Sequence, residues 1–149
     1  LFLHSDTALP EDAVKSIEDA LADPAVVGGS FRRRYDSRHP LLRFAAFYTY
    51  TNFYLFGVIA GDQGMFVRRS VFDAVGGFPD VPLMEDVGFT KKLRGAGRLV
   101  FLDSAATVSA RRFVKEGVSR TYLTMLRCIV LYKLGVPPEK IKRLYSDVR

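Results

Sequence analysis

The sequence predicts an α/β domain in which helices are layered over a mixed, mostly parallel sheet. Short apolar runs alternate with segments of helical periodicity, which is the pattern of strands and helices packed in layers. The chain has 149 residues, of which 48% are hydrophobic, and this is enough for one core. No internal repeat or interdomain linker interrupts the pattern. We therefore expect one domain over residues 1–149, with residues 115–149 as a helical tail.

The first third of the chain predicts a strand, a helix and a second strand. LFLH (1–4) is an apolar run that predicts a short buried strand. Pro10 suits the first turn of a helix, and apolar residues recur at helical spacing over 11–23. Pro24 ends this helix, because the residue before a proline is pushed out of the helical region. AVVGGSFRRRYD (25–36) predicts a strand whose two glycines indicate a bulge or a close backbone approach.

Helices and short strands alternate through the rest of the chain. Residues 40–56 predict a helix rich in aromatic side chains, and residues 117–134 predict an amphipathic helix. The other predicted elements, in chain order, are a glycine-bracketed loop and short strand over 61–69, a short helix over 70–78 with Ser70 as its N-cap, an irregular loop over 79–83, a helix over 84–97, strands over 98–103 and 106–113, and a last short helix over 137–148.

The composition of the chain limits the classes of function that fit it. The net charge is +6, but the Lys and Arg residues occur in short scattered clusters. No concentrated basic stripe or motif indicates nucleic-acid binding, and we expect none. Cys128 is the one cysteine, so no intrachain disulfide forms, which fits a cytoplasmic location. Arg43 and Asn52 interrupt the most apolar stretch, 41–60, which favours a helix buried in protein or lying at a membrane surface over a membrane span.

Two motifs at the ends of predicted elements offer polar groups to a ligand. His4-Ser5-Asp6 follows the first predicted strand, and open α/β sheets bind ligands at the carboxyl ends of their strands. The Asp6 carboxylate can hold Mg²⁺ or Mn²⁺ there. Asp62 and Gln63 lie between two glycines and offer a carboxylate and an amide to a sugar hydroxyl. Each motif, taken alone, is better explained as a polar turn.

Two further motifs supply a base and cations. Glu85 and Asp86 open a predicted helix, where the positive helix end lowers a carboxylate's pKa; such an aspartate stays ionised and can accept a proton from a hydroxyl. Arg111 and Arg112 end a predicted strand, and guanidinium groups suit phosphate oxygens. Taken alone, acidic residues in a first helical turn and cations at a strand end are also ordinary surface features.

The order of these motifs resembles glycosyltransferase family 2 on the GT-A fold, and looks closest to a small bacterial branch of it. LFLHSDT, GDQGMFVRR, GGFPD, MEDV and LRGAG follow one another along nearly the whole chain. The resemblance implies a GT-A-like (Rossmann-like) domain that transfers a sugar, with inversion, from a nucleotide-diphosphate sugar to an acceptor hydroxyl. The family's N-terminal nucleotide-binding βα units do not precede LFLHSDT here. We therefore expect an N-terminally truncated domain that alone binds the donor poorly.

The resemblance also implies catalytic and metal-binding roles. Asp86 matches the general base, and Glu85 beside it would contact the acceptor. Asp6 matches the last acidic position of a DxD-like motif, which binds a divalent cation, Mn²⁺ or Mg²⁺. His4 stands where many relatives carry the first aspartate of that motif. Its neutral imidazole can still ligate the metal beside Asp6, but it lowers the negative charge of the site.

The resemblance assigns the remaining polar residues to the substrates. Arg111 and Arg112 would face the donor diphosphate. Asp62 and Gln63 would line the sugar or acceptor pocket, and Arg68 is expected to bind substrate. The partners expected are thus a nucleotide-diphosphate sugar and an acceptor hydroxyl, and the sequence leaves assembly into a homo-oligomer open.

A different class of function is a non-catalytic transferase remnant that binds a membrane surface or a protein. The aromatic helix over 40–56 and the basic amphipathic helix over 117–134 motivate it, because such helices can contact anionic lipid. Two helices packed on the sheet explain the same pattern. Peripheral contact with the inner face of the membrane stays open on these grounds.

Overall fold

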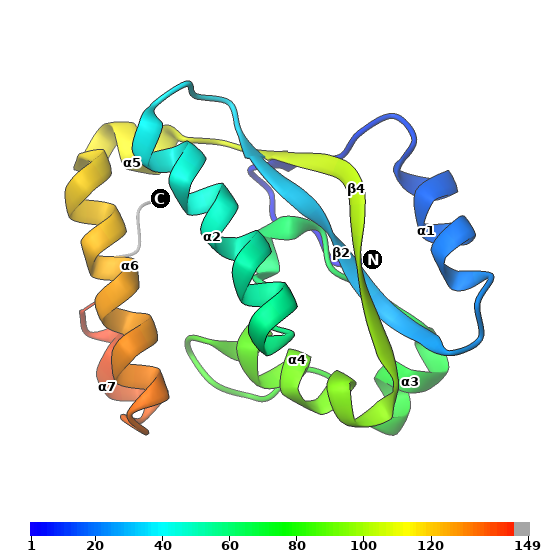
Figure 1. The fold of residues 1–149 in the computed structure, drawn as a ribbon. Helices are drawn as coiled ribbons and strands as arrows, with labels where there is room; N and C mark the ends of the chain where they lie inside the picture. The colour runs from blue at the N-terminus through cyan, green and yellow to red at the C-terminus, as the bar shows by residue number, and fades with distance from the viewer. Residues whose placement is uncertain (145–149) are drawn as a thin grey trace.

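A four-stranded mixed sheet forms the centre of the computed structural model, which describes residues 1–144 and, at Phe56, the backbone alone (Figure 1). The strands lie in the order β1-β4-β2-β3. The two long strands, β2 (Val26–Tyr35) and β4 (Arg98–Val108), pair in parallel. β1 (Thr7–Ala8) pairs antiparallel with β4, and β3 (Phe66–Val67) pairs antiparallel with β2.

The α/β class and the mixed sheet are confirmed, but the expectation of a mostly parallel sheet is wrong. Two of the three strand pairings are antiparallel. Both edges of the sheet are two-residue strands that add to the long central pair. Antiparallel neighbours need no crossover helix, so strand-helix alternation along the chain does not reveal them.

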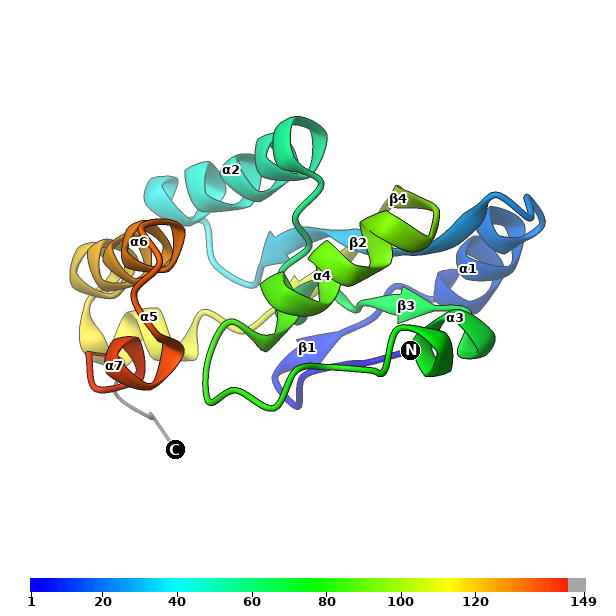
Figure 2. The ribbon, with the colours of Figure 1, turned by 90° about the horizontal axis from the view of Figure 1, so that it is seen from below.

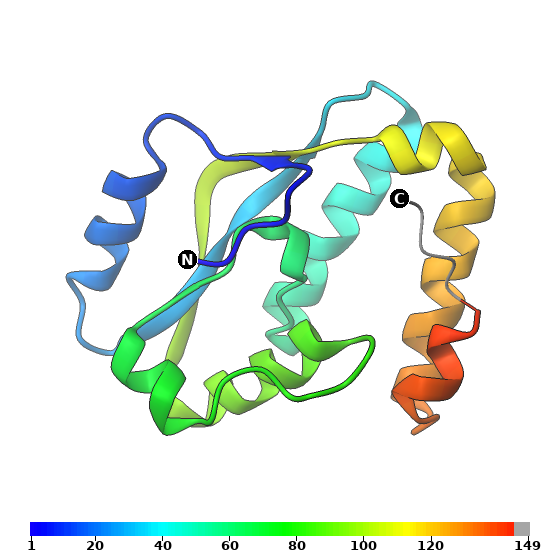
Figure 3. The same cartoon turned by 180° about the vertical axis from the view of Figure 1, so that it is seen from behind.

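Helices surround this sheet and cover much of its area. Figure 2 shows α2 on one side of the long strands β2 and β4 and the N-terminal segment on the other, and Figure 3 shows that segment from behind. In Figure 1, α5, α6 and α7 stack together at one end of the molecule. The helices are α1 (Ala13–Leu21), α2 (Pro40–Phe56), the 3₁₀ helix η1 (Gly61–Gln63), α3 (Arg69–Ala74), α4 (Glu85–Ala96), α5 (Arg111–Glu116), α6 (Val118–Lys133) and α7 (Pro138–Lys142).

The N-terminal run LFLH is not the buried strand that its composition predicts. The side chains of Leu1, Phe2 and Leu3 are 55%, 37% and 44% exposed. Within residues 1–144, this run pairs with the rest of the sheet through an isolated bridge between Phe2 and Met65. Regular pairing starts only at Thr7, after a turn in which the Thr7 N–H donates to the carbonyl of His4 over 3.1 Å.

Two other boundaries differ from the sequence predictions. The two strands expected over 98–113 are the single strand β4, and Arg111 and Arg112 open helix α5 instead of ending a strand. The N-cap of α3 is Arg68 and not Ser70. Of the last predicted helix, residues 145–148 lie outside the described residues.

The core lies directly beneath the loop that carries the candidate site. Ile59, Met65, Phe89 and Leu93 form a buried cluster between η1 and α4. A second cluster joins β2, α2 and α5 through Tyr35, Leu42, Phe113 and their neighbours. Burial of such side chains is the main stabilising term of the fold.

Glycine permits the close approach of the two central strands. A Cβ atom built on Gly29 would lie 2.2 Å from the carbonyl oxygen of Val100 in β4, so an alanine there must push the strands apart. A Cβ atom on Gly95, near the end of α4, meets nothing within 4 Å.

We predict opposite effects for two glycine-to-alanine changes. Gly29→Ala should lower the free energy of unfolding by about 2–3 kcal/mol, because the backbone carbonyl of Val100 cannot move aside cheaply. Gly95→Ala should leave it unchanged or raise it by up to about 1 kcal/mol, because alanine loses less entropy in a helix. Urea unfolding followed by circular dichroism measures both, and equal effects of the two changes would contradict the close approach.

Candidate functional site

Three segments that are distant in the sequence meet at one pocket. His4 comes from the N-terminal turn, Gly61 opens η1, and Glu85 and Asp86 open α4. A Cβ atom on Gly61 would lie 3.0 Å from Nε2 of His4 and 3.5 Å from Oδ2 of Asp86, so both side chains converge on this glycine. The pocket has a volume of about 200 Å³ and is lined by Phe2, His4, Gly61, Met65, Phe78, Glu85 and Asp86.

The Asp86 carboxylate is fixed by two backbone donors. The N–H of Gly61 donates to Oδ2 over 2.7 Å, and the N–H of Val87 donates to Oδ1 over 2.7 Å. A carboxylate has about four lone-pair sites. Each oxygen therefore keeps acceptor capacity, so Asp86 is held in place and can still take a proton.

The environment of Asp86 favours its protonated form. Burial raises the pKa of Asp86, the N–H donors of Gly61 and Val87 lower it, and the nearby carboxylates of Glu85 and Asp62 raise it, with a net upward direction. The lowered pKa expected for a carboxylate at a helix start is therefore wrong, because desolvation outweighs the two donors. A raised pKa brings an aspartate closer to the range in which a general base works near neutral pH.

An unusual backbone conformation leads into this carboxylate pair. Met84, the N-cap of α4, has φ 63° and ψ 22°, and among the non-glycine residues of 1–144 only Met84 has a positive φ. A side chain in this left-handed region costs of order 1 kcal/mol. Helix α4 then starts at Glu85.

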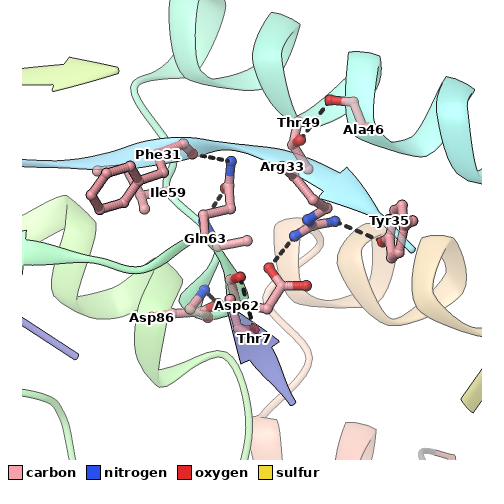
Figure 4. A network of polar contacts seen from close by, with 12 residues as sticks. Thr7, Phe31, Arg33, Tyr35, Ala46, Thr49, Ile59, Asp62, Gln63 and Asp86 are labelled. Atoms are coloured by element: carbon pink, nitrogen blue, oxygen red, sulfur yellow. Dashed lines mark hydrogen bonds and ion pairs between the residues drawn. The ribbon is translucent and has the colours of Figure 1, made fainter. Parts of the chain in front are cut away.

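A buried ion pair anchors the neighbouring η1 loop. The side chain of Arg33, in β2, is 4% exposed and pairs with the Asp62 carboxylate. It also donates to the hydroxyl of Tyr35 over 3.2 Å, and Figure 4 shows its guanidinium between these two partners. Burial works against the charged form of Arg33, but the charges and hydrogen bonds of Asp62 and Tyr35 together outweigh it and raise the pKa of Arg33. Asp62 therefore lies against β2, outside the residues that line the Asp86 pocket.

Gln63 is buried beneath the loop. Its exposed fraction is 0%. Its Oε1 accepts the N–H of Ala60 over 3.0 Å, and its Nε2 donates to the carbonyl of Phe31 over 3.4 Å (Figure 4). The amide supports the backbone of η1 from below and does not reach the pocket.

His4 and Asp6 are both exposed beside the ends of β1 and β4. The carbonyl of Asp6 accepts the N–H of Ser109 over 2.9 Å, whereas His4 points toward Gly61 and Asp86. Within residues 1–144, no three His, Cys, Asp or Glu side chains form a group that could hold a metal ion. A single carboxylate such as that of Asp6 can still contribute to a Mg²⁺ site, because Mg²⁺ is commonly held by one or two carboxylates together with substrate phosphates and water.

The three predicted arginines lie in different environments. Arg111 is exposed in the first turn of α5. Two residues before it, the N–H of Ser109 donates to the carbonyl of Asp6, which brings this part of the chain next to Asp6. Arg112 is half-buried, with its Nε 3.5 Å from a carboxylate oxygen of Glu116. Arg68 donates to the carbonyls of Leu21, Asp23 and Val26. It therefore links the end of α1 to the start of β2, and it does not line the Asp86 pocket.

Sequence reasoning missed the part played by Arg33. The signal was the period of two in FRRRY, because Phe31, Arg33 and Tyr35 share one face of β2 and all three are buried. An arginine in phase with two core aromatic residues predicts a buried charge that needs a partner. Arg32 and Arg34, on the other phase, are exposed.

No family model, curated protein or solved structure matches the chain. Within residues 1–144, no helix combines the length and the apolar character that crossing a membrane requires.

The raised pKa of Asp86 predicts a specific pH dependence of stability. Its folded-state pKa lies above the value of about 3.9 expected in the unfolded chain. Its contribution to stability is then fully present below that unfolded pKa and is lost as pH rises through the folded one. The free energy of unfolding of the native protein, minus that of Asp86→Asn, should fall as pH rises from about 4.

Urea unfolding of both proteins at a series of pH values measures this difference. Asn lacks one acceptor for the two N–H donors, which adds an offset that does not depend on pH. A difference that stays constant or increases with pH would contradict the raised pKa.

Proposed function

We propose that this chain carries the acceptor site and the diphosphate site of an inverting glycosyltransferase of the GT-A type. The donor is a nucleotide-diphosphate sugar and the acceptor is a hydroxyl group. The observation that carries the proposal is the meeting of His4, Gly61 and Asp86, from three distant segments, around one fixed carboxylate in a pocket.

Asp86 is the general base in this proposal. The acceptor hydroxyl enters the pocket beside Asp86 and gives up its proton to a carboxylate oxygen. Its oxygen then bonds to the anomeric carbon, while the bond from that carbon to the diphosphate oxygen breaks and the diphosphate leaves with the electron pair. One displacement of this kind inverts the anomeric centre. The two N–H donors keep the carboxylate oriented, and Glu85 at the pocket rim contacts the acceptor.

The leaving diphosphate is placed at the edge where Asp6 and Arg111 lie. When bound, a divalent cation, Mg²⁺ or Mn²⁺, supplies charge neutralisation of the diphosphate there. Asp6 is the carboxylate that would hold it, and the exposed guanidinium of Arg111 would contact phosphate oxygens directly. Arg112 supports this end less directly, because its guanidinium faces Glu116 in α5.

His4 fits the base better than the cation. Its Nε2 lies on the Gly61 side of the pocket, next to Asp86. An imidazole there can hydrogen-bond an acceptor hydroxyl or the carboxylate. In this proposal Asp6 is therefore the cation ligand, and His4 contacts the acceptor.

The proposal predicts that Asp86→Asn abolishes transfer. Loss of a general base typically lowers kcat by about 10²–10⁴-fold, and the KM for the donor should change little, since Asp86 faces the acceptor. The release of nucleoside diphosphate from UDP- and GDP-sugars, with Mg²⁺ or Mn²⁺ present, measures kcat and the donor KM. The assay uses the native protein and the Asp86→Asn variant, each purified as the full chain that the cell produces.

Asp73→Asn is the matched control, because Asp73 is an exposed carboxylate on α3 away from the pocket. It should leave the rate unchanged. A rate for Asp86→Asn within a few-fold of the native rate would remove Asp86 from the role of base.

A further inference from the structure

Positive charge is concentrated in the C-terminal helices. Residues 1–110 contain 12 Lys and Arg against 13 Asp and Glu, whereas residues 111–144 contain nine against two. The helices α5, α6 and α7 therefore carry the net positive charge of the molecule at one end (Figure 1).

The outer side of α6 combines these charges with exposed apolar residues. Leu123 and Val130 are 65% and 53% exposed, and Leu134 at the C-cap is 75% exposed. Their spacing of seven and four residues places them on one side of the helix. Arg120 and Arg127, also exposed and seven residues apart, flank the same row. We call these five residues the α6 outer face.

The inner side of α6 is already occupied. Thr121 and Cys128 are buried, and Tyr122 and Met125 pack on the cluster formed with α2 and α5. The α6 outer face is thus a second apolar row that the packing of residues 1–144 does not use. Apolar residues on two sides of a helix are typical of a helix that buries both of these sides.

The neighbouring helix α2 also presents aromatic residues to solvent. Figure 1 shows α2 beside α6, and the two helices are in contact. Phe44, Phe47 and Tyr54 are each more than half exposed. Aromatic side chains are favoured at the boundary between lipid headgroups and acyl chains, and basic side chains are drawn to anionic lipid.

We propose that the α6 outer face docks the molecule on the surface of an anionic lipid bilayer. Leu123, Val130 and Leu134 enter the boundary between headgroups and acyl chains, and Arg120 and Arg127 contact lipid phosphates. Charge complementarity favours a bilayer over a protein as the occupant, because the apolar row lies within the one strongly basic part of the chain. The proposal goes beyond sugar transfer and stands independently of it.

Co-sedimentation with vesicles tests the docking. The chain should bind vesicles of phosphatidylcholine with about 30% phosphatidylglycerol at least about tenfold more tightly than vesicles of phosphatidylcholine alone, and high salt should weaken this binding. Arg120→Gln with Arg127→Gln should lower the partition coefficient about tenfold or more, since each basic residue near such a surface contributes to binding. Leu123→Gln with Val130→Gln should lower it for both vesicles.

The control is Arg69→Gln with Lys91→Gln, which removes two exposed cations from α3 and α4 and should leave binding unchanged. All these side chains are exposed, and circular dichroism checks that each variant is folded. Absence of binding to the anionic vesicles at low salt, or an equal loss in the control, would overturn the proposal and assign the face to a protein partner.

Discussion

The buried ion pair between Arg33 and Asp62 is the constraint on which the candidate site depends. Its guanidinium is almost fully enclosed, so it cannot be left without its carboxylate. Asp62 lies in η1, and the preceding residue, Gly61, donates its N–H to Asp86. The hydroxyl of Thr7 also donates to the carbonyl of Asp62 over 3.4 Å. One pair thus links β2, η1, α4 and the N-terminal segment.

The two ends of the proposed site rest on different supports. Asp86 is set by backbone donors and by the core cluster beneath η1, which makes it a rigid group with a raised pKa. Asp6, beside the edge strand β1, and Arg111, in the first turn of α5, are both exposed, so the proposed phosphate-bearing substrate can reach their charges. The proposed displacement at a sugar carbon requires a base that is held firmly in place. It also requires accessible side chains that can contact a cation and phosphate oxygens, and the proposed site has both.

Periodicity predicted the helices well, because their apolar faces are local patterns: the aromatic helix runs over residues 40–56 as expected. The sheet was less predictable. The run LFLH has the composition of a buried strand, yet regular pairing begins at Thr7, because pairing depends on distant partners. The sequence did not predict that His4, Gly61 and Asp86 meet, because that meeting depends on tertiary contacts between distant segments. The burial of Gln63 and the pairing of Asp62 with Arg33 depend on tertiary contacts that no local pattern encodes.

Amide hydrogen exchange at Gly61 tests most directly whether the Arg33–Asp62 pair holds the base. Arg33→Met should speed exchange of the Gly61 N–H by about tenfold or more relative to the Phe31 N–H in β2, because η1 opens locally once its anchor is lost. Arg32→Met is the control, since Arg32 is the adjacent residue and its pair with Asp103 is exposed. Unchanged Gly61 exchange in Arg33→Met, or the same change in both variants, would contradict the account.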